Sequence, residues 1–143
     1  MLIEFIVLAD RAEVLGGKLY LMGGGFDRVA VTQLPGAAKF DVAVSVLVDY
    51  HETNVQHLFE ISCLDPDGGQ VFEPMRGALE MGRPPGMSVG GAQRAMLVLQ
   101  GPFTFPAAGE YSWAAKVDDG PTTRVGFRVE QLQVLAPMPP PHA

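Results

Sequence analysis

Hydrophobic and polar side chains alternate with a period of two in four segments of the chain. These segments are FDVAVSVLVDY (40–50), QHLFEISCL (56–64), EYSWAAKVD (110–118) and TTRVGFRVE (122–130). Because successive side chains of a strand point to opposite faces, the alternation predicts strands with one face on a core and most of the other face in water. No segment keeps the period of a helix over several turns. The pattern therefore predicts an all-β protein.

Turn-forming residues separate the predicted strands. DPDGG (65–69) and DDGP (118–121) have the Asp and Gly content of tight reversals between antiparallel strands. Short strands at this spacing predict an antiparallel β-sandwich with immunoglobulin-like, Greek-key connections. It forms a single domain over residues 1–135, followed by a Pro-rich tail (136–143) that we expect to be disordered. We expect eight strands, or nine if the arms of the last hairpin are counted separately: 2–9, 18–22, 27–33, 40–50, 56–64, 70–74, 94–101 and 110–129.

Three consecutive glycines, Gly23 to Gly25, raise the question of a phosphate site. Phosphate-binding loops direct backbone N–H groups and a helix N-terminus at the anion. Here the residues that follow, FDRVAVTQL, favour a strand, and Arg28 stands where the dinucleotide fingerprint has its third glycine. We therefore predict a bulge or a turn between strands.

The glycines end a segment, ADRAEVLGGKLYLMGG (9–24), that predicts a hairpin of two strands joined at Gly16 and Gly17. Opposite charges near its strands can pair and fix the register. The expected pairs are Asp10 with Arg28, or Asp27 with Arg11.

Composition and charge narrow the class of partner. The net charge is −6, with 10 Lys and Arg residues, whereas a nucleic-acid surface needs clustered basic side chains to replace counterions, so we expect no nucleic-acid partner. The first apolar run lacks the basic start of a signal peptide, and no run reaches the about 18 residues of a membrane span. The single cysteine, Cys63, cannot form an intrachain disulfide, which favours a reducing cytoplasm.

His51, Glu52 and His57 form the one cluster of residue types that bind metals. The zinc-protease motif requires a second His four positions after the first, and Val55 occupies that position. A site of these three residues would make the protein a small metal-dependent hydrolase. Cys63 and His57 lie about 20 Å apart on one predicted strand, too far for a nucleophile pair. We expect no catalytic residue and no cofactor.

The longest predicted loop, GRPPGMSVGG (82–91), is a candidate for a partner contact. Arg83 offers a planar set of donors, and Met81 and Met87 flank the loop with adaptable apolar surface. Outward-facing apolar residues suggest in addition that a second subunit covers part of a sheet: Ala43, Leu47, Leu58 and Leu64. We therefore predict a protein partner or self-association, with the contact candidates Met81, Arg83, Met87, Asp27 and Arg28.

Three stretches together resemble a known family: ADRAEVLGGKLYLMGGGFDRV (9–29), HETN (51–54) and GRPPG (82–86). They are similar to a bacterial family of unknown function, common in actinobacteria and their relatives, with an ADRAEV…GKLYL.GGG.DR signature. The resemblance extends over nearly the whole chain. It implies a small, intracellular, mostly β protein and assigns a function to no residue.

These observations favour a non-enzymatic binding or assembly module in the bacterial cytoplasm. It would use a face of the sandwich or its loops. The metal-dependent hydrolase is the alternative.

Overall fold

A computed structural model describes residues 1–133 and 139–142. Within these residues the chain forms eleven strands and one 3-10 turn, so the prediction of an all-β protein is confirmed. No helix of this described part is long and apolar enough to cross a membrane. The elements are β1 (Leu2–Leu15), β2 (Lys18–Gly24), β3 (Arg28–Val31), β4 (Gly36–Ala38), β5 (Asp41–Asp49), η1 (Tyr50–Glu52), β6 (His57–Leu64), β7 (Met75–Leu79), β8 (Ala92–Gln100), β9 (Phe103–Phe105), β10 (Gly109–Val117) and β11 (Thr123–Gln131).

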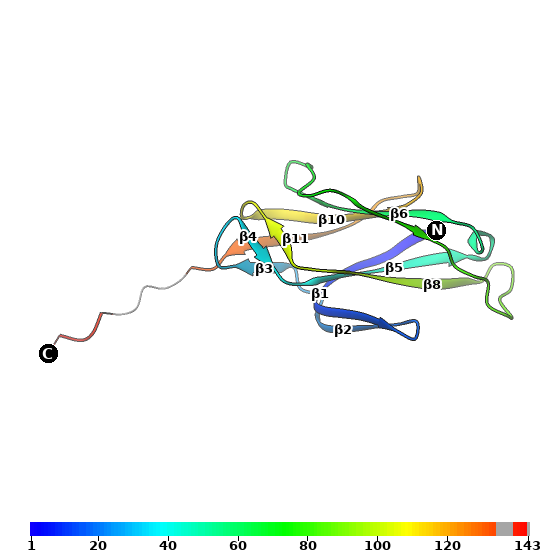
Figure 1. Cartoon of the computed structure of the whole chain (residues 1–143), viewed down its shortest axis with the longest axis horizontal. Coiled ribbons are helices and arrows are strands. Elements are labelled where there is room, and N and C mark those ends of the chain that lie inside the picture. The colour runs from blue at the N-terminus through cyan, green and yellow to red at the C-terminus, as the bar shows by residue number, and fades with distance from the viewer. Residues whose placement is uncertain (134–138, 143) are drawn as a thin grey trace.

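The described strands form three sheets, none of which closes into a barrel. Their orders are β2-β1-β5-β8, β3-β11-β10-β6-β7 and β4-β9. Every pairing is antiparallel except that of β3 with β11, which is parallel, so the expectation of a purely antiparallel fold is wrong at this edge. The parallel pair arises because the chain leaves the first sheet after β2 and joins the second sheet beside its last strand. Figure 1 shows the two larger sheets as two layers, with the end of the β1–β2 hairpin projecting below the layer of β5 and β8.

Side chains from both large sheets meet in one core. Trp113 of β10 and Val44 of β5 are fully buried, and aromatic rings from several strands gather around Phe40. The alternation that predicts the inward face of β10 is confirmed, because Tyr111, Trp113, Ala115 and Val117 are all buried.

The structure differs from the predicted strands at three places. The strand expected at 70–74 lies at 75–79. Asp65 closes a turn by accepting hydrogen bonds from the N–H groups of Asp67 and Gly69. After that turn, Gln70 forms a single bridge with Leu64, and continuous pairing with β6 begins at Met75. The pair β4–β9 was not expected, because strands of three residues are too short to show an alternation. β1 extends to Leu15 instead of ending near residue 9.

The outward face of β5 is not in water, contrary to the alternation argument. Asp41, Ala43 and Ser45 on this face are buried. Ala43 packs in a small cluster with Ala12 and Leu19 of the β1–β2 hairpin. The cover predicted from a second subunit is thus supplied at Ala43 by the chain itself.

The predicted tail lies partly outside the described residues. The prediction of disorder for 136–138 and for Ala143 concerns residues outside the described part. Residues 139–142 are exposed and carry no regular secondary structure.

Candidate interaction surface

Arg83 lies on the 82–91 loop and contacts its own chain. Its Nε donates to Thr53 Oγ1 (3.0 Å), Nη1 donates to the Tyr50 hydroxyl (3.0 Å), and Nη2 donates to the Tyr50 carbonyl (3.1 Å). The guanidinium also lies over the Tyr50 ring, 3.7 Å from its centre. The guanidinium therefore fastens the loop to η1, and a contact of Arg83 with a partner stays a prediction.

The two methionines of this loop are half-buried, and the Met81 carbonyl accepts a hydrogen bond from the Asn54 N–H (2.7 Å). Gln93 at the start of β8 donates to the Gly82 carbonyl (2.7 Å). These bonds fix the start of the loop. Their effect is structural, and the use of Met81 and Met87 by a partner stays a prediction.

Arg28 pairs with a residue that the sequence did not suggest. Its Nη1 lies 3.8 Å from the Glu130 carboxylate on β11. Neither Asp10 with Arg28 nor Asp27 with Arg11 is among the ion pairs of residues 1–133 and 139–142. Those pairs were expected beside the hairpin, but the parallel pairing of β3 with β11 places Arg28 next to β11 instead. The roles of Asp27 and Arg28 in partner contact stay predictions.

His57 does not form a metal site with His51 and Glu52. Its Nε2 lies 2.9 Å from the Glu52 carbonyl oxygen and its Nδ1 lies 2.7 Å from Asp118 Oδ2. Both ring nitrogens therefore lie within hydrogen-bond distance of oxygen atoms of the chain itself. One Glu52 oxygen accepts from the Asp49 N–H, while the other pairs with the Met1 amino group. No set of three His, Cys, Asp or Glu side chains within the described part is arranged to hold a metal ion.

Asp118 is a residue that sequence reasoning treated only as part of a turn. It has a positive φ of 51° at the end of β10. Its carboxylate accepts a hydrogen bond from the Leu58 N–H (2.8 Å) and pairs with His57. The Leu58 N–H first, and the His57 ring second, hold the pKa of Asp118 below its usual range.

Cys63 is a buried residue of β6. Burial raises the pKa of its thiol to about 12, so the thiol stays protonated at neutral pH and is a poor nucleophile. Cys63 therefore acts as a small buried hydrophobic residue of the core.

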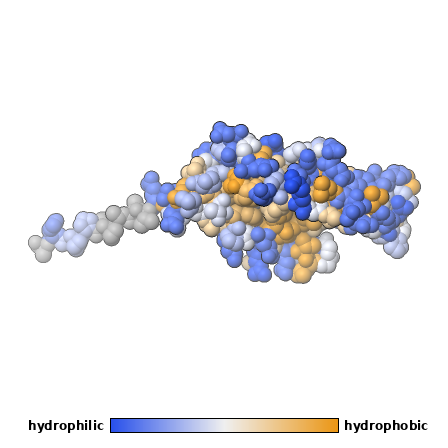
Figure 2. Space-filling model, turned by 45° about the horizontal axis from the view of Figure 1, so that its top comes forward, coloured by the Kyte–Doolittle hydropathy of each residue, from blue (hydrophilic) through white to orange (hydrophobic). Residues whose placement is uncertain are grey.

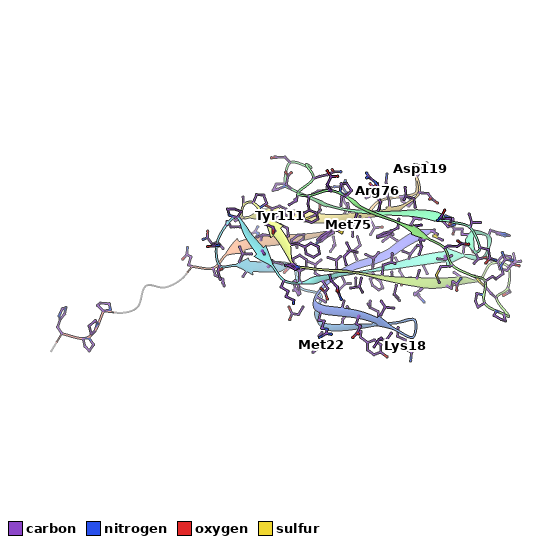
Figure 3. The ribbon with its side chains drawn as sticks, viewed as in Figure 1. Lys18, Met22, Met75, Arg76, Tyr111 and Asp119 are labelled. Carbon is purple, nitrogen blue, oxygen red and sulfur yellow. The ribbon has the colours of Figure 1, made fainter. Side chains whose placement is uncertain are left out.

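The β1–β2 hairpin carries the largest group of exposed apolar side chains. Of nine large apolar side chains exposed in the described structure, four lie on residues 9–24, where β1 pairs with β2: Leu15, Tyr20, Leu21 and Met22. Figure 2 shows hydrophobic surface on the projecting hairpin, and Figure 3 shows Lys18 and Met22 on the side of it that faces away from the sheets.

The hairpin has an outward and an inward face. Tyr20 pairs with Glu13 and Met22 pairs with Arg11 across the two strands, and all four side chains are exposed. On the other face, Ala12 is buried and packs toward β5 and β8. Beside Ala12, a hollow of about 500 Å³ is lined by Glu13 and Val14 of the hairpin and by Met96, Val98 and Gln100 of β8.

Asp41, at the start of β5, fixes the hairpin to the sheet. Its side chain is 7% exposed, and its Oδ2 accepts a hydrogen bond from the Ala12 N–H (2.8 Å) while Oδ1 accepts one from the Gly101 N–H (3.2 Å). Hydrogen bonds to a charged carboxylate are stronger than those to a neutral acceptor. The two bonds of Asp41 therefore hold β1 of the hairpin close to the end of β8.

The glycine run turns the chain from the hairpin to the second sheet. Gly23 has a φ of 61°, and a Cβ built on it would lie 2.4 Å from Asp10 Oδ2. Gly25 has a φ of 88°, its N–H donates to the Leu8 carbonyl (2.8 Å), and β3 follows it. The prediction of a turn between strands is confirmed.

A second hollow, of about 550 Å³, lies beside the small β4–β9 sheet. It is lined by Pro35, Val71, Phe72, Met75, Pro102, Phe103, Thr104 and Pro106. None of these residues is titratable, so this hollow offers no acid, base or strong nucleophile for catalysis.

Comparison with known proteins places the chain in a family. The profile of a family of unknown function (DUF6941) matches residues 4–130. The chain belongs to this family. No curated protein and no solved structure matched the chain. Membership of DUF6941 agrees with the resemblance found in the sequence, but because the family has no known function, the functional argument rests on the geometry of the chain.

The hairpin surface was missed by the sequence reading, although the hairpin itself was predicted. A signal was present in Leu19 to Met22, four consecutive apolar residues. Such a run breaks the polar–apolar alternation of a strand with one wet face, and it marks a strand whose outward face is apolar as well.

Proposed function

We propose that the protein is a non-enzymatic binding or assembly module and that the outward face of the β1–β2 hairpin contacts a protein partner. One observation carries the proposal: Leu15, Tyr20 and Met22 are 55%, 51% and 67% exposed on an element that projects from the body of the molecule. Single exposed apolar residues are ordinary, but a group of them on one element is typical of a contact surface.

The chemistry of the surface favours a protein over a small polar ligand. Each exposed apolar side chain gains about 25 cal/mol for every Å² removed from water. Arg11, Glu13 and Lys18 lie among the apolar residues on the same face and can form the polar rim that protein interfaces have.

We infer as well that the two larger sheets form a β-sandwich of Greek-key, immunoglobulin-like type. One core draws on both sheets. The Tyr111 hydroxyl donates to the Ala107 carbonyl (2.7 Å), four residues upstream at the start of β10, which is the geometry of the tyrosine corner found in such folds.

We place this module in the bacterial cytoplasm. The support is chemical: the one cysteine is free and buried, as is common where thiols stay reduced.

In-cell photo-cross-linking tests the proposed surface. A photo-reactive phenylalanine analogue replaces Met22 in the full chain, and a matched variant carries it at Val89, which is 69% exposed on the 82–91 loop. We expect protein adducts from position 22 and few from position 89. Equal yields at the two positions, or none at position 22, would contradict the proposal.

A further inference from the structure

We propose that the partner of the hairpin is a second copy of this chain, and that the two β2 strands pair antiparallel about a two-fold axis at Leu21. The inference rests on the proposed function, since it names the occupant of the same surface. It would join two four-stranded sheets into one continuous sheet.

The free edge of β2 provides the hydrogen-bonding groups for this pairing. β2 is the last strand of its sheet, and within the described chain β1 is its one neighbour. Gly16 and Gly17 have φ values of 57° and 74°, as in a type I′ turn, which joins Leu15 and Lys18 by a hydrogen bond. Antiparallel ladders alternate, so the N–H and C=O groups of Leu19 and Leu21 point away from β1.

The edge of β2 lacks most of the features that protect free strands. Natural edge strands are guarded by prolines, by inward-pointing charges, or by a covering helix or loop. β2 reads KLYLMGG and contains one charge, at its first residue, and no proline. Of the other six residues, four carry large, mainly apolar side chains and two are glycines.

The charges of the hairpin suit a two-fold pairing. The chain has a net charge of −6, which opposes the approach of two copies in most orientations. On the hairpin, however, two acids and two bases cancel: Asp10, Arg11, Glu13 and Lys18.

The register of β1 with β2 then sets the order of side chains across the dimer. Met22 lies next to Arg11, and Tyr20 lies next to Glu13. With Leu21 on the axis, side chains line up in rows across the four strands. Each row contains Arg11 and Met22 of one copy, followed by Tyr20 and Glu13 of the second copy. A methionine therefore meets an aromatic ring at the centre, and each row ends in opposite charges. A partner with an unrelated surface would not be matched in this way.

The first test measures the mass of the full chain by sedimentation over a range of concentrations. We expect a monomer–dimer equilibrium. Met22→Glu should weaken the dimer by about tenfold or more, because it replaces the apolar contact with Tyr20 of the second copy by a charge that must leave water. Val89→Glu changes an equally exposed residue and should leave the equilibrium unchanged. Melting of both variants should match the parent chain, which shows that they fold.

The second test is a symmetric cross-link. In a hydrogen-bonded antiparallel pair the Cα atoms lie about 5.5 Å apart, within the range of a disulfide. Leu21→Cys should therefore give disulfide-linked dimers on mild oxidation, and Val89→Cys should give few. The native Cys63 does not interfere, because it is fully buried.

A monomer at every concentration, a dimer insensitive to Met22→Glu, or cross-linking at position 21 no faster than at position 89 would overturn the second copy as partner. The proposed function would survive that result if the in-cell adduct at position 22 has the mass of a different protein. The proposed function itself would be contradicted if the photo-reactive residue at position 22 gives no protein adduct in cells.

Discussion

The hairpins β1–β2 and β10–β11 are built alike and end in different surroundings. Each joins two antiparallel strands by a short turn that contains positive φ angles. β10–β11 lies between β6 and β3 within its sheet, and its outward face carries a pair between Arg128 and Glu110 (2.6 Å). β2 lies at an edge, and its outward face is largely apolar.

The difference shows that alternation alone does not identify the wet face of a strand. Both faces of β10–β11 agree with the simple rule of apolar inside and charged outside. In β1–β2 the small residues Ala9 and Ala12 face the protein, while the larger Tyr20 and Met22 face outward. The position of an element in its sheet therefore decides what its side chains do.

The largest expected contrast is in stability. Trp113→Ala in β10 should lower the free energy of unfolding by about 3–5 kcal/mol, because the side chain is fully buried. Tyr20→Ala in β2 should change it by no more than about 0.5 kcal/mol in the monomer. Urea denaturation at low protein concentration measures both. Similar losses for the two variants would show that the hairpins are equally embedded.

The second-largest loss of stability is expected for Asp41→Ala. It leaves the buried Ala12 N–H without its acceptor, whereas the Gly101 N–H keeps its bond to the Phe40 carbonyl. The lost acceptor should lower the free energy of unfolding by about 1–3 kcal/mol. Amide hydrogen exchange should speed up in β1–β2 and stay unchanged in β10–β11. Uniform acceleration in both hairpins would mean that Asp41 stabilises the whole fold and not the hairpin.

Gly23→Ala should lower the free energy of unfolding by about 1 kcal/mol or more. A non-glycine residue is strained at a φ of 61°, and the new Cβ would displace the Asp10 carboxylate. Gly77→Ala in β7 is the matched control, because Gly77 has no positive φ and no atom lies within 4 Å of the added Cβ. Equal melting temperatures of the two variants would contradict the turn that we assign to Gly23.

The smallest effect concerns the turn of β10–β11. The pKa of Asp118 is lowered in the folded protein, mainly by the Leu58 N–H. Its ionised form therefore stabilises the fold above the unfolded value of about 3.9, and this contribution is lost as the pH falls through the folded value. The difference in unfolding free energy between the parent chain and Asp118→Asn should be constant above about pH 5 and shrink in more acidic solution.

Asp119→Asn provides the control for this pH series. Asp119 is the next residue in the same turn, and among the described side-chain hydrogen bonds it has none. A pH dependence of Asp119→Asn equal to that of Asp118→Asn would remove the special role of Asp118.

Strands could be predicted from the sequence where one face of the strand is buried and the other carries charged residues. β6, β10 and β11 follow this pattern, and their positions were predicted. β5 was placed correctly, but the burial of Asp41 was not foreseen, and the cover of Ala43 was expected from a second subunit. Both depend on a hairpin more than 20 positions away in the sequence. Periodicity contains no information on such a contact.

The interaction surface could be predicted only in part. Arg83 on a Pro-rich loop has the chemistry of a contact residue, yet its donors are used by Tyr50 and Thr53, about 30 positions earlier. Tyr20 and Met22 belong to a predicted hairpin, and their exposure follows from the place of β2 at the edge of its sheet. Edge positions depend on the pairing of all strands and do not appear in a local pattern.

Residue-resolved amide exchange along β2 tests the central claim most directly. The Tyr20 N–H faces β1 and should be protected at all protein concentrations, whereas those of Leu19 and Leu21 face the free edge. We predict that the Leu19 and Leu21 amides exchange fast in dilute solution and become protected as the protein concentration rises. Exchange at Leu19 and Leu21 that does not depend on concentration would contradict the account.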